Sequence, residues 1–333
     1  MQDRFHYNAI TLMKVIAMFF ITWFHFKWYV PDNFAFMFIG GAIGNSIFFF
    51  CSGFLMSIKE ERYIGQWLAK KYLRLMPAVW TFFVCVILYE FLRYGDFDPP
   101  CLTEWLYPSQ FWFVQAILFY FVVTYIYCKL CKFLGKAPNN GTCFNCLFVL
   151  FFMVHLGWYH LFVDKGAVSL DEGGIKVWFY WYLFFLLGYY CRSKDLLSKL
   201  YAPFRNRGFL IHALLLAFSV ILFFLYKKAC TSDALIYLQV LIVPTLLLFV
   251  VYSCYILCQR LSEIELPNRL KCWLSNLSDM TLDVYVVQIY IIKIIMPKVC
   301  FPMNILVSFL FILLVAYIVF KVSDFMKRKL FPL

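Results

Sequence analysis

Long apolar runs separated by short polar segments dominate the chain, and this alternation restricts what it can fold into. Ten runs qualify as membrane helices, at about residues 8–28, 34–58, 74–94, 110–134, 143–163, 176–191, 208–227, 235–258, 279–298 and 301–323. The hydrocarbon core of a bilayer is about 30 Å thick and needs roughly 20 apolar residues per helix. Only helices and closed barrels satisfy their backbone polar groups there. We therefore predict an all-α, polytopic membrane bundle of about ten transmembrane helices.

The composition leaves little material for a water-soluble part. Of the 333 residues, 64% are hydrophobic and 14% are charged, whereas a soluble domain is about half apolar and about a quarter charged. The longest polar segments lie near 59–73, 95–109, 164–175 and 192–207. We expect residues 1–333 to form one transmembrane domain without a fused soluble domain, so any activity lies in the membrane or at its surfaces.

The basic residues distinguish the two sides of the membrane. With ten spans and the N-terminus inside, the inner segments hold 21 of the 30 Lys and Arg residues. The outer loops hold five: Arg93, Lys165, Lys227, Lys228 and Lys298. Cytoplasmic loops of membrane proteins carry an excess of Lys and Arg. We predict that both termini are cytoplasmic and that the net charge of +12 reflects topology rather than binding of nucleic acid.

The cysteines do not indicate a disulfide framework or a metal site. Most of the 13 cysteines lie inside apolar runs, unlike those of small secreted domains. Cys143 and Cys146 form one CxxC motif, but a zinc site needs two more ligands at suitable spacing, and none is near. The sequence therefore predicts a protein that holds no metal.

The first apolar run carries two ionisable residues, Lys14 and His25. At about 100° per residue they lie within about 20° of the same helical face, roughly 16 Å apart along the axis. Lys14 can extend to the cytoplasmic headgroups, and His25 can be an interfacial or hydrogen-bonded histidine. A functional pair is equally open, because ionisable residues inside spans are costly and histidine exchanges protons near neutral pH.

Two further motifs also allow two interpretations. Ser52 and Gly53 interrupt an aromatic run, where small residues permit close helix packing or a local opening of the backbone. Lys71 and Arg74 come just before Pro77. They either anchor a helix that a proline breaks at its start, or form a phosphate-binding patch on the cytoplasmic side.

Taken in order, these motifs resemble acyltransferase family 3, which includes many bacterial O-acetyltransferases of surface polysaccharides. The family's first helix typically carries a basic residue, ten residues and a histidine, here Lys14 to His25, with lysine where arginine is usual. Its other motifs match "FFFCSGFL" (Phe48 to Leu55), Lys71-Arg74-Pro77, "WFV" (Trp112 to Val114), "FFLLGYYCR" (Phe184 to Arg192) and "TLDVYVVQ" (Thr281 to Gln288). The resemblance covers nearly the whole chain.

Three positions depart from the family pattern. Thr11 stands where an acidic residue is frequent, and Gln110 and Gln288 stand where histidine is common. His25 is therefore the remaining candidate for proton transfer.

The resemblance implies an enzyme of the bacterial cytoplasmic membrane that takes an acyl group from cytoplasmic acyl-CoA, usually acetyl-CoA. The acceptor would be a hydroxyl of an outward-facing polysaccharide or of its lipid-linked precursor. The site residues that follow are His25 and Lys14 for catalysis, Lys71, Arg74, Ser52 and Gly53 for the acyl-CoA, and Trp112, Asp283, Tyr285 and Gln288 for the acceptor. Asp283 either orients His25 or pairs with a cation inside the membrane.

Two other classes remain open at this stage. A transporter or flippase for a glycan or a small anionic solute would also suit ten spans with charged residues at depth, although the chain shows no convincing internal repeat. A scaffolding membrane protein is the third class. A transferase differs from both because it needs acyl-CoA and leaves an ester.

Overall fold

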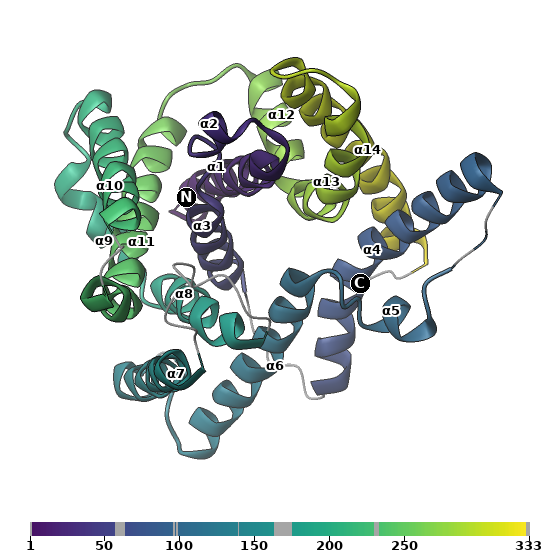
Figure 1. Ribbon diagram of the computed structural model, residues 1–333. Coiled ribbons are helices and arrows are strands. Elements are labelled where there is room, and N and C mark those ends of the chain that lie inside the picture. Colours follow the sequence, from purple (N-terminus) through teal and green to yellow (C-terminus); the bar gives the residue numbers. More distant parts are fainter. Residues whose placement is uncertain are drawn as a thin grey trace. The chain divides into compact units, whose positions relative to one another are not determined.

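The structure is a computed structural model that describes residues 2–56, 64–95, 97, 99–138, 140–162, 175–229 and 233–330. Within these ranges every regular element is helical (Figure 1). The elements are α1 (Gln2–His25), η1 (Phe26–Tyr29), α2 (Asp32–Ala35), α3 (Gly41–Phe54), α4 (Ile64–Tyr94), α5 (Leu102–Leu106), α6 (Trp112–Phe133), α7 (Gly141–Phe162), α8 (Ile175–Ser193), α9 (Leu196–Tyr201), η2 (Ala202–Phe204), α10 (Phe209–Ala229), α11 (Asp233–Ser262), α12 (Asn268–Asp279), α13 (Thr281–Ile295), η3 (Met296–Lys298) and α14 (Met303–Lys329).

The chain divides into two compact units. The first unit comprises Met1–Phe20, Gly40–Ser57 and Ile126–Ser275, and the second comprises Ile21–Ile39, Ile58–Tyr125 and Asn276–Leu333. Helix α1 is continuous and contributes its first part to one unit and its last turn to the other.

The all-helical, multi-span fold is confirmed, with a helix in each of the ten predicted segments. Seven helices of the described part are long and apolar enough to cross a membrane: α1 with η1, α4, α6, α7, α10, α11 and α14. An eighth span is possible if α12 and α13, which meet at a bend of 65°, count as one. The number of ten spans and the cytoplasmic placement of the termini stay predictions.

The second predicted helix, 34–58, is wrong as a continuous element. The chain forms the single turn α2 and then α3, and the two are separated at Gly40, whose φ is +128°. Only glycine adopts such a φ readily, and an added Cβ would lie 2.8 Å from the Phe20 ring. Helix α3 has 14 residues, about 21 Å at 1.5 Å per residue, so it is too short to cross a bilayer core unaided.

Two other boundaries also differ from the prediction. Pro77 does not mark a helix start at residue 74, because α4 runs from Ile64 through this buried proline to Tyr94. The segment before residue 279, predicted as an inner loop, forms α12. Its apolar residues follow the helical spacing Leu270, Trp273, Leu274 and Leu277, and the intervening polar residues keep its hydropathy low.

The first unit is built around the crossing of α3 and α8, which lie side by side in Figure 1. A Cβ on Gly53 would lie 1.9 Å from the Phe185 carbonyl oxygen, and a Cβ on Gly188 would lie 2.0 Å from the Phe50 carbonyl oxygen. The two glycines therefore bring the two backbones into direct contact, as small residues do between membrane helices. Helices α7 and α11 pack around this pair, and α10 packs on α11.

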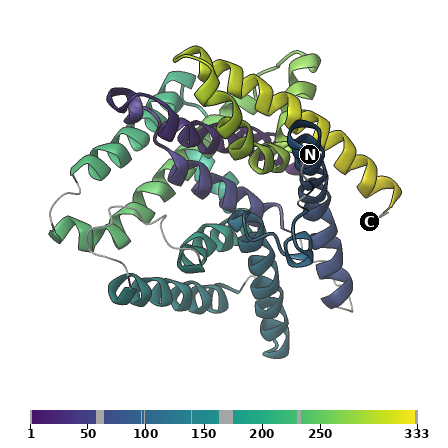
Figure 2. The same cartoon turned by 45° about the vertical axis from the view of Figure 1, so that its right-hand side comes forward.

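The second unit is built around α13, α14 and α4, which pack on one another. Helix α14, yellow in Figure 2, runs as one long element to the C-terminal end. Its outer face carries exposed large apolar side chains: Leu306, Leu310, Phe311, Leu314 and Ile318. Helix α10 of the first unit carries a similar stripe: Leu210, Leu214, Phe218, Ile221 and Leu225. Exposed apolar faces of this length are the surfaces of helices that contact lipid.

We expect Gly188→Ala to destabilise the protein by about 1–3 kcal/mol, the usual cost of overpacking a close contact. The new methyl group would meet backbone atoms of α3, which cannot rotate away. The free energy of unfolding in mixed detergent micelles measures the effect. The control is Gly157→Ala on α7, where an added Cβ meets no atom within 4 Å. Equal stability of the two variants would contradict the proposed backbone contact.

Candidate active site

His25 is the last residue of α1, in the second unit. Its ring lies beside Phe24 and Trp28, with 5.8 Å between ring centroids in both pairs, and its side chain is half-buried. Within the described ranges no hydrogen bond engages either ring nitrogen of His25. The imidazole is therefore held by aromatic contacts while its nitrogens stay available to accept or donate a proton.

A buried polar pair lies one turn before His25. The Thr22 hydroxyl of α1 donates a hydrogen bond to Oε1 of Gln288 on α13, at 2.8 Å. Both residues are 0% exposed. Residues three apart share a helical face, so Gln288 packs on the face of α1 that carries His25. Nε2 of Gln288 is buried and makes no hydrogen bond within the described part of the chain, which leaves an amide donor unused near the histidine.

Aromatic residues continue this site toward α6. Tyr285 lies one turn before Gln288 on α13, and its ring centroid is 4.9 Å from that of Phe113. Phe113 in turn contacts Trp112 at the start of α6, with 6.1 Å between the centroids. The structure thus connects four of the predicted residues, His25, Gln288, Tyr285 and Trp112, through contacts within the second unit.

Asp283 does not join this group. It is 2% exposed, and its Oδ1 accepts a hydrogen bond from the Ser323 hydroxyl of α14 at 3.4 Å. Lys327, one turn further along α14, lies within electrostatic range of this carboxylate. Asp283 thus interacts with Ser323 and with the charge of Lys327, and both interpretations of its role stay predictions.

Two cations come together at the end of the second unit that the charge pattern predicts to be cytoplasmic. Arg74 is exposed on α4 and lies within electrostatic range of Lys327. Lys71 is engaged differently, with its Nζ 5.5 Å from the Trp67 ring centroid and 5.6 Å from that of Phe121. Arg74 is therefore more available for a phosphate group than Lys71, whereas Lys327 also lies within electrostatic range of the Asp283 carboxylate. The sequence pattern did not indicate Lys327, because in the sequence this lysine is only one of several positive charges after the last span.

The first unit holds the other predicted site residues. Lys14 lies within electrostatic range of the Cys51 thiol on α3. The Ser52 hydroxyl donates to the Phe48 carbonyl of its own helix at 2.9 Å, and Gly53 packs on the backbone of α8. Ser52 and Gly53 thus serve the internal bonding and packing of α3, and their role in binding acyl-CoA stays a prediction.

The end of α3 is held by the last residue of the "FFLLGYYCR" motif. Nη1 of Arg192 donates a hydrogen bond to the Phe54 carbonyl oxygen at 3.1 Å. Carbonyls in the last turn of a helix lack intrahelical donors and carry partial negative charge, so a cation stabilises them. Arg192 therefore fixes the C-terminal end of α3 against α8.

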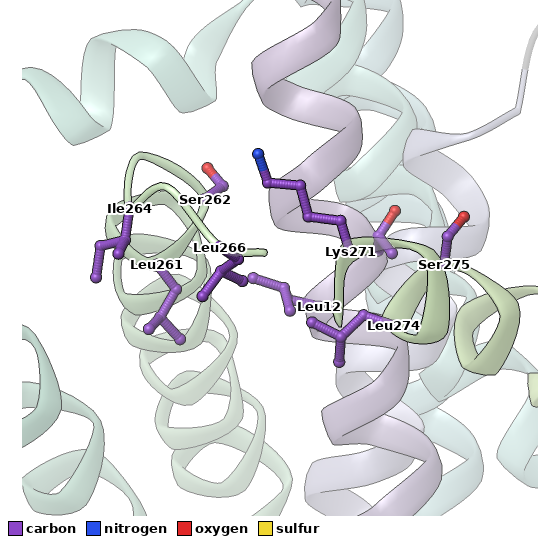
Figure 3. Close-up of a pocket in the computed structure, with 9 residues that line it drawn as sticks. Leu12, Leu261, Ser262, Ile264, Leu266, Lys271, Leu274 and Ser275 are labelled. Carbon is purple, nitrogen blue, oxygen red and sulfur yellow. The ribbon is translucent and has the colours of Figure 1, made fainter. Parts of the chain in front are cut away.

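A small pocket of about 100 Å³ lies in the first unit between the start of α1, the end of α11 and α12 (Figure 3). Leu12, Leu261, Leu266 and Leu274 gather at its apolar side, and the Lys271 side chain extends toward Ser262. Ligand pockets usually measure roughly 300–1,000 Å³. We assign no ligand to this pocket.

The fold and the site define a multi-pass membrane protein with a proton-transfer candidate on its first helix. The family model described as an acyltransferase domain, that of acyltransferase family 3, matches residues 7–321, nearly the whole chain. The chain belongs to this family, so the predicted resemblance is confirmed, and the family implies a membrane acyltransferase. Comparisons with curated proteins and with solved structures find no match.

We expect Thr22→Val to cost about 1–3 kcal/mol of stability, because it leaves the buried Gln288 amide oxygen without its donor. Thr22→Ser should restore most of this loss. The free energy of unfolding in mixed micelles measures both. The matched control is Thr245→Val on α11, an exposed threonine whose hydroxyl bonds only its own helix at Leu241. A loss of stability in Thr22→Val no larger than that in Thr245→Val would show that the Thr22–Gln288 hydrogen bond does not stabilise the protein.

Proposed function

We propose that the protein is a membrane O-acyltransferase that moves an acyl group, acetyl in the first instance, from cytoplasmic acyl-CoA to a hydroxyl of a glycan. The acceptor is a surface polysaccharide or its lipid-linked precursor, and the enzyme resides in the bacterial cytoplasmic membrane. Membership of the acyltransferase family supports the reaction class. The donor, the acceptor and the location are part of the proposal.

The observation that carries this proposal is the state of His25. An unbonded ring nitrogen alone does not distinguish His25, because Nε2 of the buried His155 is also unbonded in the described chain. His25 differs in lying on the face of α1 against which the Gln288 side chain packs. In the described structure the His25 nitrogens have no hydrogen bond, and the neighbouring Gln288 amide also keeps an unused donor. An acid–base group beside an unused donor suits a reaction that moves a proton and develops charge on an oxygen.

In the proposed reaction the acceptor hydroxyl oxygen attacks the carbonyl carbon of the thioester. His25 takes the hydroxyl proton as the C–O bond forms. The carbonyl oxygen gains negative charge in the tetrahedral intermediate, and the Gln288 amide supplies a hydrogen bond to it. The C–S bond then breaks, and the CoA thiolate leaves with the proton from the His25 imidazolium. The products are an ester of the glycan and free CoA, and His25 returns to its neutral form.

The donor side of the proposal rests on the basic residues of the second unit. Arg74 would bind a phosphate group of the acyl-CoA, with Lys71 contributing less because its ammonium group already lies over two aromatic rings. An arginine binds phosphate through two parallel hydrogen bonds. Lys14 lies roughly 16 Å along α1 from His25, and its catalytic role stays a prediction.

We expect His25→Ala to reduce acyl transfer by roughly 100- to 10,000-fold, the usual contribution of a general base, while acyl-CoA binding is retained. The assay measures radiolabelled acetyl passed from acetyl-CoA to the glycan fraction of membranes that contain the protein. His160→Ala on α7, an exposed histidine outside this group, is the control. Full activity of His25→Ala would remove the general base from the proposal.

We expect Arg74→Ala to weaken acetyl-CoA binding by about 10- to 100-fold, since a hydrogen bond to a charged group contributes about 1.5–3 kcal/mol. Calorimetry on the purified protein in nanodiscs measures the affinity. Arg93→Ala is the matched control, because it removes an exposed arginine from the other end of α4.

Unchanged affinity in Arg74→Ala would move the donor site elsewhere on the protein. Absence of binding to any acyl-CoA by the wild type would reject the transferase and favour a transporter.

A further inference from the structure

The second unit contains a cavity that none of the predicted site residues lines. Its volume is about 480 Å³, within the range of roughly 300–1,000 Å³ that ligand sites occupy. Helices α4 and α13 form two of its walls, and Pro100, Gln110 and Phe111 from the segment before α6 close a third side. The charge pattern predicts that these ends of α4 and α13 face outward. The cavity is therefore large enough for a ligand and lies toward the predicted acceptor side.

Aromatic rings form much of the cavity wall. Phe82 contacts Tyr290 edge-on and Phe111 edge-on, with 5.8 Å between the ring centroids in both pairs. The ring centroid of Phe83 lies 6.0 Å from that of Phe111 and 5.4 Å from that of Trp105. These mutual contacts hold the rings in place, so they form a preorganised apolar surface. Such a surface suits the C–H face of a pyranose ring.

The polar side chains of the cavity combine donors and acceptors. The Tyr290 hydroxyl donates a hydrogen bond to Oε1 of Glu90 at 3.2 Å, which orients the carboxylate within the wall. Lys293 and Gln110 add an ammonium and an amide group. Among the described lining residues Glu90 and Lys293 carry the formal charges, and these sum to zero. A neutral polyol, whose hydroxyls both donate and accept, matches this set better than an ion of either sign.

The cavity adjoins the candidate active site through one shared wall. Phe111 lines the cavity, and its ring centroid is 6.5 Å from that of Tyr285. Tyr285 lies one turn from Gln288, which packs on the face of α1 that carries His25. A ligand held in the cavity is thus separated from the proton-transfer group by the Phe111–Tyr285 contact within the same unit.

We propose that this cavity binds an uncharged hexopyranose ring of the acceptor glycan, with Phe82 against the sugar face and Glu90, Gln110 and Lys293 bound to its hydroxyls. The proposal rests on the proposed transferase function and specifies its acceptor class. It makes Glu90 and Lys293 determinants of acceptor specificity that take no part in the chemical step.

Saturation-transfer-difference NMR tests the proposal on the full chain in nanodiscs, without any acyl donor. The probes are methyl β-D-glucopyranoside, methyl β-D-galactopyranoside and methyl N-acetyl-β-D-glucosaminide. We expect saturation of ring C–H protons in at least one glycoside. Glu90→Gln, Lys293→Gln and Phe82→Ala should reduce the signal at least fivefold. Lys298→Gln, an exposed lysine of η3 outside the cavity, should leave it unchanged.

The outcomes test sugar binding in the cavity separately from acyl transfer. Absence of saturation in all three glycosides, or equal saturation in the wild type, Glu90→Gln and Lys293→Gln, overturns the proposal. Glu90→Gln is nearly isosteric, so it tests the site even if Phe82→Ala does not fold. Sugar binding by a protein that transfers no acyl group from any acyl-CoA would reject the transferase and leave the sugar site standing. Acyl transfer with an acceptor KM unaffected by Glu90→Gln would reject the sugar site alone.

Discussion

Hydrocarbon offers no hydrogen bonds, so each polar side chain that enters this bundle needs its partner inside the protein. Thr22 bonds to Gln288 and thereby fixes α1 against α13. Ser323 bonds to Asp283 and fixes α14 against α13. Apolar packing alone would not set these positions, because a leucine gains little by exchanging lipid for protein. The polar contacts therefore determine which faces of the helices meet in the second unit, and with them the position of the candidate active site.

In the first unit, contacts between backbones set the positions of the helices. At Gly53 and Gly188 the absence of side chains lets α3 and α8 approach until carbonyl groups of one helix lie against the other. Arg192 then bonds the last carbonyl of α3, at Phe54. The Ser52-Gly53 motif is predicted to bind the acyl-CoA. The packing of α3 on α8 by itself accounts for the glycine of this motif. The same pair of helices carries Cys51, whose thiol lies within electrostatic range of Lys14.

What the sequence predicted well was local. The apolar runs predict the ten helices, and helical periodicity places Lys14 and His25 on one face of α1. The break at Gly40 was missed because it depends on a left-handed φ that hydropathy does not record. The electrostatic interaction of Asp283 with Lys327 joins residues 44 positions apart on two helices, and only the packing of α13 on α14 reveals it. Helix α12 was missed because its polar face hides its apolar stripe from a hydropathy average.

The buried Nε2 of Gln288 has a consequence for how this protein can evolve. A donor without an acceptor in a dry interior costs about 1–3 kcal/mol, so this amide group lowers the stability of the protein when no substrate is bound. A substrate oxygen that accepts a hydrogen bond from Nε2 removes this cost, and the substrate binds more tightly as a result. Selection for heat resistance alone would replace Thr22 and Gln288 together by apolar residues, because a single replacement leaves the other polar group unpaired, whereas selection for turnover would retain the amide. The amide thus marks a place where durability and activity impose opposite demands on the same side chain.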